Sequence, residues 1–481
     1  MQQNQYDVAI IGAGVVGAAI ARKLGQYKLR TALIDAAHDV AMGASKANSA
    51  IVHAGYDCPP QSLEAQLNVR GNQLMTAWCA ELCVPLIRCG SLVIGFDEAD
   101  MDKLHQLYER GLENGVPGMK LVDGDEARAL EPMLSQRVVG ALWAETGGIT
   151  CPYQLTVACA ENARANGCEW LLGAPVTAIE REECGLIIHA GAREIRAKYA
   201  VNAAGVFADD IAGMLGDDLF SIHPRKGEYL LLDRAATDVQ RIIFQTPSKL
   251  GKGILVSPTV DGNCFAGPTA VDMLDKLDSD ITQSGIEQLM QMSKRSVPSL
   301  NLRAVITSFA GIRAQPSTGD FVISVCPTDG RMIHAAGICS PGLTSAPAIA
   351  ERVCGLLAQT GLALDEDESY VPARSAIPAF REMDFDERRK AIRENPLYAK
   401  VICRCETITE AEIVEAIRRG ARDMDAIKRR TRAGMGRCQG GFCGPRIMEI
   451  LARELGVGLD QVTKRGGGSY MVRKMEGGRG E

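Results

Sequence analysis

Four cysteines near the C-terminus form the pattern with the clearest chemical meaning in this sequence. Cys403 and Cys405 lie in V-I-C-R-C, and Cys438 and Cys443 lie in G-R-C-Q-G-G-F-C. Ionised thiols are soft metal ligands, so two close pairs joined by a helix-forming segment predict one metal centre. Glycines crowd the second pair, where the backbone has to pass close to an inorganic core.

The ligand spacing favours an iron–sulfur cluster and leaves other uses of the cysteines open. C-x-C with C-x4-C differs from the C-x2-C spacing of a zinc ribbon, although spacing alone does not exclude zinc. Disulfides fit less well, because nothing marks the chain for secretion. Basic residues upstream of the second pair either offset the charge of a cluster or form a solvated face. These residues are Lys428, Arg429, Arg430, Arg432 and Arg437.

Length and charge restrict the class of protein. The chain has 481 residues, 46% of them hydrophobic, which predicts about three domains. Its net charge of −6 is uneven, because residues 372–481 hold 23 Lys and Arg against 16 Asp and Glu. The acidic net charge of the chain argues against a nucleic-acid-binding protein. The basic C-terminal part is better explained by a docking surface for a partner or by residues that offset the charge of a cluster. No apolar run is long enough to span a bilayer, so we expect a cytoplasmic protein with at most peripheral membrane contact through a partner.

The first 35 residues carry a dinucleotide-binding pattern. A short apolar run is followed by G-x-G-x-x-G, a helix of small residues, a second strand and an acidic residue. The first glycine makes the turn, the second lets the backbone approach a pyrophosphate, and the third permits close helix packing. The acid accepts a hydrogen bond from a ribose hydroxyl. The pattern comprises the strand 6–11, Gly12, Gly14, Gly17, the helix 18–24, the strand 29–34 and Asp35.

The pattern by itself leaves FAD and NAD open. FAD is favoured because the motif begins near the N-terminus and no second G-x-G-x-x-G follows for a nicotinamide cofactor. A metal cluster also needs a donor of single electrons, and a flavin converts a two-electron hydride into one-electron steps.

Motifs beyond this region resemble the D-amino-acid-oxidase-like flavoprotein superfamily. Residues 43–59 read G-A-S-K-A-N-S-A-I-V-H-A-G-Y-D-C-P, which resembles the flavin-edge segment of its glycerol-3-phosphate and L-2-hydroxyglutarate oxidising branches. Further matching segments follow in the expected order and extend the resemblance to about residue 365. They are residues 201–205, 223–229, 251–259, 262–269, 309–314 and 336–344.

This resemblance implies an α/β fold, in which a Rossmann-like FAD-binding domain is interleaved with an α+β substrate domain built on an antiparallel sheet. The FAD-binding domain is expected at residues 1–75, 140–215 and 305–365. The substrate domain is expected at residues 76–139 and 216–304.

The cysteine-bearing region resembles the bacterioferritin-associated-ferredoxin-like domain, which implies a small helical domain with a 2Fe-2S cluster at residues 399–460. The charged, proline-containing segment 366–398 is expected to be a connector, and residues 461–481 a basic, glycine-rich tail. T-E-A-E at 409–412 is a capping box that predicts a helix through Arg419. The same pairing of domains occurs in anaerobic glycerol-3-phosphate dehydrogenases.

The resemblance also singles out residues for the site. Oxidation of a secondary alcohol needs an anchor for the substrate's anion and a base for its hydroxyl proton. His53 matches the position of the base, and Arg313 and Lys252 match positions for the anion. Implied cofactor contacts beyond the glycine motif and Asp35 are Ser45, Asn48, Ser49, Val176, Ala204, Gly205, Gly311, Gly337, Pro341, Gly342, Leu343 and Thr344. The implied cluster ligands are Cys403, Cys405, Cys438 and Cys443.

The expected activity is an FAD-dependent dehydrogenase for a small anionic hydroxy substrate. The resemblance implies sn-glycerol 3-phosphate first and L-2-hydroxyglutarate or another 2-hydroxy acid second. A hydride passes to FAD, and single electrons then pass through the 2Fe-2S cluster to an accepting protein subunit, in a multi-subunit complex. The alternatives are an amine or amino-acid dehydrogenase of the same superfamily, and a redox-adaptor or iron-handling protein.

Overall fold

The computed structural model describes residues 5–247 and 253–473. The chain forms two compact units. The first comprises residues 1–36 and 40–374, and the second comprises residues 37–39 and 375–481. The boundary at residue 374 falls within the segment for which we predicted a connector.

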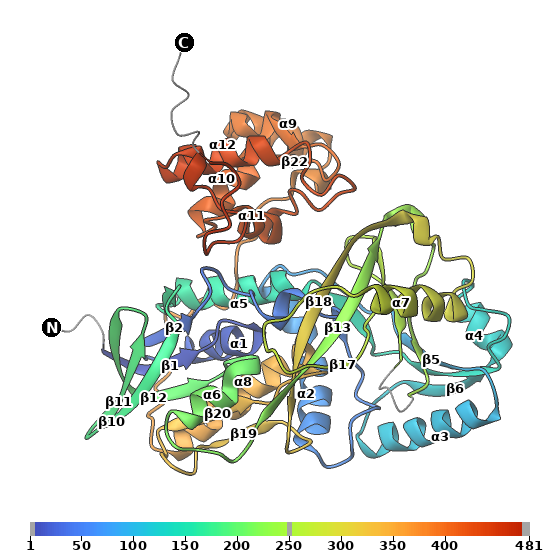
Figure 1. The fold of residues 1–481 in the computed structure, drawn as a ribbon, viewed down its shortest axis with the longest axis horizontal. Helices are drawn as coiled ribbons and strands as arrows, with labels where there is room; N and C mark the ends of the chain where they lie inside the picture. Colours follow the sequence, from blue (N-terminus) through green and yellow to red (C-terminus); the bar gives the residue numbers. More distant parts are fainter. Residues whose placement is uncertain (1–4, 248–252, 474–481) are drawn as a thin grey trace. The chain divides into compact units, whose positions relative to one another are not determined.

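Among the described residues, an eight-stranded sheet organises one end of the first unit (Figure 1). Strands β9, β2, β1, β12 and β20 are parallel neighbours, and the hairpin β10–β11 extends β12 on one side. The strands are β1 (Gln5–Ile11), β2 (Thr31–Asp35), β9 (Glu169–Leu172), β10 (Val176–Glu182), β11 (Gly185–Ala190), β12 (Arg193–Asn202), β19 (Val322–Val325) and β20 (Met332–Ala336).

Helices rich in small apolar residues pack on one face of this sheet and form its main core. They are α1 (Val15–Leu24), α2 (Leu63–Glu81), α5 (Pro152–Ala165) and α8 (Gly342–Gln359), while the short α6 (Ala208–Gly213) follows β12. The predicted strand, helix and strand near the N-terminus correspond to β1, α1 and β2. Helix α1 begins three residues earlier than predicted because Gly14 is its N-cap. Its N-terminus therefore lies at the glycine turn itself.

A nine-stranded, mainly antiparallel sheet supports the other end of the first unit within the described part of the chain. The long strands β13 and β18 pair along most of their length and run through the middle of the unit (Figure 1). The strands are β5 (Ser91–Gly95), β6 (Met119–Asp123), β7 (Gly140–Ala144), β13 (Ile222–Leu232), β14 (Ile242–Gln245), β15 (Leu255–Pro258), β16 (Cys264–Gly267), β17 (Val271–Asp272) and β18 (Val305–Pro316).

Helices α3 (Glu98–Glu113), α4 (Gly124–Leu130) and α7 (Gln283–Ser296) pack on this second sheet. A small sheet of β3 (Ile51–Val52), β4 (Leu86–Ile87) and β8 (Gly148–Thr150) completes the unit. The predicted class, an α/β part with a mainly parallel sheet, a part with an antiparallel sheet and a small helical C-terminal unit, is confirmed.

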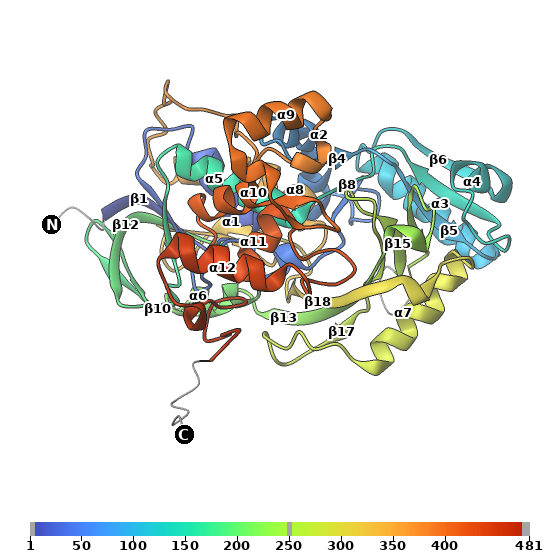
Figure 2. The ribbon, with the colours of Figure 1, turned by 90° about the horizontal axis from the view of Figure 1, so that it is seen from above.

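The second unit is small and helical, with its own apolar core. Helices α10, α11 and α12 contact one another (Figure 2). Its elements are α9 (Phe385–Glu394), β21 (Val401–Cys403), β22 (Ile408–Thr409), α10 (Glu410–Arg418), α11 (Met424–Thr431) and α12 (Gly444–Leu455). The predicted capping box is present, because the Glu412 carboxylate accepts from the Thr409 amide at 2.7 Å. Across residues 5–247 and 253–473, no helix is both long and apolar enough to cross a membrane.

Candidate functional site

The glycine turn between β1 and α1 has the geometry of a phosphate cradle. Gly12 has a φ of +112°, and a Cβ there would lie 2.2 Å from the Ala203 carbonyl oxygen. A Cβ on Gly17 would lie 1.8 Å from the Gly12 carbonyl oxygen. Side chains are therefore excluded on both sides of the turn, and the N-terminus of α1 presents its amides beside it. These features fit a dinucleotide pyrophosphate.

Asp35 lies directly beside this turn at the end of β2. Its carboxylate accepts a hydrogen bond of 2.6 Å from the Ala13 amide. Val176, which we predicted as a cofactor contact, begins β10, two residues after Ala174, whose amide donates to the Asp35 carbonyl at 2.9 Å. The structure thus keeps the predicted ribose acceptor at the cradle and puts Val176 at the start of the edge strand β10, which pairs with β11 and not with β1 or β2.

The loop 43–50 joins the cradle to the long strands. Ser45 Oγ accepts from the Val15 amide at 2.8 Å, in the first turn of α1. Asn48 is held within the loop, because its side chain donates to the Ala44 and Ser45 carbonyls at 3.0 and 3.2 Å. A Cβ on Gly311 of β18 would lie 1.8 Å from the Ala47 carbonyl oxygen, so glycine permits this close approach.

His53 lies where β3 meets the N-terminus of α8. Its amide donates to Thr344 Oγ1 at 2.9 Å, and its Nε2 lies 3.4 Å from Ser340 Oγ. Asn72 donates to the His53 carbonyl at 2.8 Å, which fixes the backbone on the other side. The imidazole is partly exposed and lies 5.9 Å from the Phe244 ring, measured between centroids.

The predicted loop 337–344 forms the entry to α8 and is shaped by close contacts. Gly337 has a φ of +64°, and a Cβ there would lie 2.7 Å from the Pro316 side chain. Pro341 precedes the helix, and Gly342, Leu343 and Thr344 form its first turn. The predicted flavin-loop residues and His53 are thus brought together, although almost 300 residues separate them in the sequence.

Arg313 and Arg225 are opposite one another on β18 and β13. Arg225 forms a two-pronged ion pair with the Asp272 carboxylate at 2.5 and 3.0 Å. Arg313 donates to the Thr269 carbonyl at 2.7 Å, while its buried Nε has no hydrogen-bond partner among the described residues. Unlike Arg225, Arg313 has no hydrogen-bonded carboxylate among the described residues, although its charge, after the Arg225 hydrogen bond, helps to lower the pKa of Asp272.

Tyr229 is a candidate site residue that sequence reasoning missed. Its hydroxyl lies 3.1 Å from Ser49 Oγ, and its ring stacks on Phe309 at 4.7 Å between centroids. Burial raises its pKa, and the Arg313 charge and the Ser49 hydrogen bond oppose that rise. The residue stands in the motif H-P-R-K-G-E-Y, but only strand pairing shows that its hydroxyl meets the loop 43–50.

Two further predictions concern other parts of the first unit. Lys252, predicted beside the substrate, lies outside the described residues.

Ala204 and Gly205 form the turn after β12, where the Ala204 amide donates to Asn202 Oδ1 at 3.3 Å and Gly205 has a φ of +59°. The carbonyl of the preceding residue, Ala203, faces Gly12. This turn and the cradle are therefore in direct contact.

The four C-terminal cysteines are brought together in the second unit. The sulfurs of Cys403 and Cys405 are 3.7 Å apart, Cys403 also hydrogen-bonds Cys443, and Cys405 hydrogen-bonds Cys438. Cys403 and Cys443 are buried, whereas Cys405 is exposed and Cys438 is partly exposed. The quartet therefore has a buried edge and an open edge.

Backbone amides favour the ionised form of two of the four cysteines, Cys403 and Cys438, whereas burial and the neighbouring thiols raise the pKa of Cys405. The pKa of the Cys403 thiol is lowered, first by the hydrogen bond from Cys443 and then, against burial, by the Gly434 and Glu406 amides. The pKa of Cys443 is raised, because it keeps the proton that the two thiols share. Amides of residues 440–442 lower the pKa of Cys438. A donor set of four thiols, with amides aimed at them, fits a metal–sulfur core.

Three of the five basic residues upstream of Cys438 are buried in ion pairs, whereas Arg437 is exposed. Arg429 and Arg430 bind the Asp39 carboxylate at 2.5 and 2.7 Å, and Arg432 binds Glu406 at 3.0 Å. These arginines are buried, and Lys428 donates to Gln439 of the second ligand loop at 3.2 Å. The hydrogen bond made by Lys428 helps to fix that loop.

Known families match both units. Residues 7–356 match the model described as FAD dependent oxidoreductase, and residues 401–453 match that of the BFD-like 2Fe-2S binding domain. The predicted cofactors, FAD and a 2Fe-2S cluster, are thereby confirmed, which decides against zinc at the cysteines.

Individual relatives extend this similarity over nearly the whole chain. A glycerol 3-phosphate dehydrogenase of Caloramator mitchellensis is 47% identical over 470 residues, which cover 97% of this chain and 98% of that protein. The mitochondrial L-2-hydroxyglutarate dehydrogenase of Homo sapiens is 26% identical, over 73% of this chain and 88% of that protein. The structure of dithionite-reduced L-alpha-glycerophosphate oxidase from Mycoplasma pneumoniae with FAD bound matches 77% of this chain and 99% of that chain, with a TM-score of 0.74 and 31% identity.

Proposed function

The chain belongs to the family of FAD-dependent oxidoreductases, and from this premise we propose that it is a dehydrogenase of a small anionic hydroxy substrate. The first candidate is sn-glycerol 3-phosphate, because the relative that is 47% identical over 97% of this chain is a glycerol 3-phosphate dehydrogenase. L-2-hydroxyglutarate is the second candidate, since more distant relatives act on it by name. Both substrates carry an anion near a secondary alcohol.

Arg313 carries the proposal. It lies opposite Arg225 of β13, and among the described residues its guanidinium hydrogen-bonds only the Thr269 carbonyl. Arg225, the other arginine at this position, is already paired with a carboxylate. A guanidinium binds phosphate or carboxylate with two parallel hydrogen bonds, so Arg313 can hold the substrate's anion and fix its orientation.

His53 supports the same proposal, because it can act as the base that removes the proton of the substrate hydroxyl. An alcohol becomes a ketone when its carbon loses a hydride and its hydroxyl loses a proton. The Nε2 of His53 accepts that proton, and Ser340 and Thr344 orient the residue from the start of α8. When bound, FAD supplies the acceptor for the hydride and releases electrons one at a time. The residues that would hold FAD are the cradle of Gly12, Asp35 and the first turn of α8.

The open edge of the cysteine quartet supports electron transfer to a partner protein. Phe442, between Cys438 and Cys443, is 87% exposed. Arg404, Arg437 and Arg446 are also exposed on the segments that carry the cysteines. An exposed aromatic residue among arginines suits an acidic protein surface, so we propose an acidic electron acceptor. The enzyme would work in a reducing compartment such as the cytoplasm, because the ligand thiols have to stay reduced for cluster assembly.

Anaerobic titration tests the substrate. The purified protein is mixed with sn-glycerol 3-phosphate, L-2-hydroxyglutarate or glycine, and the flavin absorbance is followed. Bleaching by glycerol 3-phosphate at the lowest concentration is expected. Bleaching by glycine alone would show that the protein is instead an amino-acid dehydrogenase. If no small reductant bleaches the flavin, a redox-adaptor function would be favoured.

Two matched pairs of variants test the residues. Arg313→Lys should raise KM by about tenfold or more, since it loses a charge-assisted bidentate contact, whereas the exposed Arg303→Lys should not. His53→Asn should lower kcat about 10²- to 10⁴-fold, whereas the exposed His105→Asn should not. Normal turnover in His53→Asn would remove the base from the proposal.

Electron acceptors of opposite charge test the partner surface. Acidic cytochrome b5 should accept electrons faster than basic cytochrome c, and salt should slow only the acidic acceptor. Arg446→Glu should lower the rate with cytochrome b5 and leave phenazine dye reduction unchanged. Equal rates with both proteins at low salt would contradict an acidic partner.

A further inference from the structure

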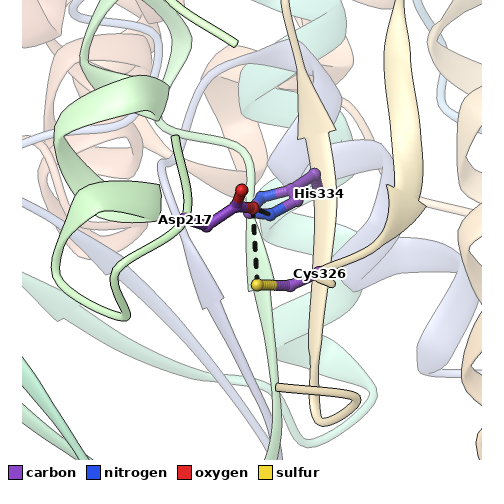
Figure 3. A group of neighbouring side chains, drawn as sticks. All are labelled: Asp217, Cys326 and His334. Atoms are coloured by element: carbon purple, nitrogen blue, oxygen red, sulfur yellow. Dashed lines mark hydrogen bonds and ion pairs between the residues drawn. The ribbon is translucent and has the colours of Figure 1, made fainter. Parts of the chain in front are cut away.

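A buried cluster in the first unit has no role in the chemistry described so far. Asp217, Cys326 and His334 point toward one another (Figure 3). His334 Nε2 lies 2.8 Å from Asp217 Oδ2, and Cys326 Sγ lies 3.4 Å from the same oxygen. The His334 side chain is fully buried and that of Asp217 is 2% exposed. Such a trio is either a metal site or a hydrogen-bonded relay.

Asn202 decides between the two, because it fixes the tautomer of His334. Its Nδ2 lies 2.7 Å from the Ala208 carbonyl oxygen, and its Oδ1 is 3.3 Å from the Ala204 amide. Only an NH₂ group bonds a carbonyl, so the orientation of the amide is set by these neighbours. The second hydrogen of Nδ2 then faces His334 Nδ1 at 3.3 Å.

This contact determines which nitrogen of the neutral imidazole carries the proton. Nδ1 accepts from Asn202 and therefore carries a lone pair, so the hydrogen is on Nε2 and is donated to Asp217. Burial lowers the pKa of His334, which keeps the ring neutral. Nε2 has no lone pair for a metal. Asp217 is satisfied as well, because the Cys326 thiol and the Leu219 amide also donate to it, the latter at 3.0 Å.

The relay ends at the cofactor cradle. Asn202 is the last residue of β12 and pairs with Ile11 on one side and His334 on the other. The next amide, that of Ala203, donates to the Ile11 carbonyl at 2.8 Å. The Ala203 carbonyl oxygen lies 2.2 Å from the position of a Cβ on Gly12. A shift of the turn after β12 therefore pushes on the glycine turn.

We propose that Asp217, His334 and Asn202 form a hydrogen-bonded relay that positions the glycine turn for FAD. Asp217 holds the His334 ring, His334 Nδ1 accepts the remaining hydrogen of the Asn202 amide, and Asn202 holds the Ala203–Ala204 turn against Gly12. These are positioning residues, since they act through the backbone of the turn. The proposal depends on FAD as the cofactor and is independent of the substrate.

Two substitutions of His334 separate the relay from a metal site. His334→Gln can accept from Asn202 through its oxygen and donate to Asp217 through its nitrogen, so it keeps the relay and removes a metal ligand. His334→Leu has a similar size and loses both. FAD affinity is measured from the recovery of flavin fluorescence when the holoenzyme is diluted.

We expect the FAD dissociation constant of His334→Leu to rise at least tenfold and that of His334→Gln to stay within threefold of the wild type. Cys326→Ser keeps a donor to Asp217 and should match the wild type. Equal losses in the Gln and Leu variants would overturn the relay. Stoichiometric zinc in the wild type, absent from both variants, would identify a metal site instead.

Nitrogen NMR of the wild type keeps the test decisive if His334→Leu does not fold. The chain has six histidines, so selective labelling gives few signals, and the signal missing from His334→Gln identifies His334. The relay requires an unprotonated Nδ1 and a protonated Nε2. A protonated Nδ1 would refute it.

Discussion

Gly436 offers the sharpest test of the cluster geometry. It lies two residues before Cys438, and a Cβ there would lie 2.4 Å from Cys405 Sγ and 2.9 Å from Cys405 Cβ. A carbon atom in van der Waals contact with another carbon or with a sulfur is normally about 3.5–4.0 Å from it. Gly436→Ala therefore drives the second ligand loop against the first.

The size of the required shift sets the expected result. Rotation of the Cys405 side chain moves Sγ away but leaves its Cβ too close, so the backbone has to move by roughly 0.5–1 Å to reach van der Waals contact. Metal–ligand distances tolerate only about 0.2 Å. We expect Gly436→Ala to lose most of its cluster, since even supporting residues change metal affinity about 10- to 100-fold.

The assay measures iron, acid-labile sulfide and visible absorption in protein purified without oxygen. The wild type should contain about two irons per chain, as a 2Fe-2S cluster requires. Gly444→Ala is the matched control, because the nearest atom to its Cβ is Met424 Cε at 4.0 Å. Flavin bleaching by substrate should survive in both variants. A full cluster in Gly436→Ala, or equal losses in both, would refute the geometry.

Three further outcomes test the first unit. Gly17→Ala should lose FAD on gel filtration, because its Cβ would lie 1.8 Å from the Gly12 carbonyl oxygen, whereas Gly355→Ala, with open space around its Cβ, should keep it. Tyr229→Phe should lower kcat/KM about fivefold, the value of a hydrogen bond of about 1 kcal/mol, and an unchanged value would remove its hydroxyl from the site. Burial holds the pKa of folded His334 below 6.5, so the unfolded chain binds the proton first as the pH falls. The free energy of unfolding in urea should then decline below about pH 6.5 more steeply for the wild type than for His334→Gln, and parallel pH profiles would contradict this.

Local sequence was sufficient where the site is made of neighbours in the chain. The cradle is a strand, a turn and a helix within 25 residues, and its glycines fill sterically fixed positions, so the pattern alone predicted it. The helix capped by Thr409 was predicted for the same reason, because the capping interaction joins residues three apart. Likewise, the two closely spaced pairs of cysteines predicted a metal centre.

Ligand spacing alone could not choose the metal, and the sequence could not place the substrate residues. Zinc stayed open on spacing, because spacing constrains the loops more than the ion, whereas the resemblance to the ferredoxin-like domain predicted a 2Fe-2S cluster and the family match confirmed it. Lys252 was assigned from a short motif and stays a prediction outside the described residues. The roles of His53 and Arg313 also stay predictions, although the structure gives each a defined set of neighbours.

The amino-acid sequence by itself determined the cofactor classes, since glycine turns and paired thiols are local requirements of phosphate and metal binding. Only the tertiary structure decided which distant groups meet. Tyr229 reaches Ser49 across 180 positions, and His334 reaches Asn202 across 132. Such contacts depend on which strands pair and in which register, and a shift of one residue would turn each side chain to the other face of its sheet.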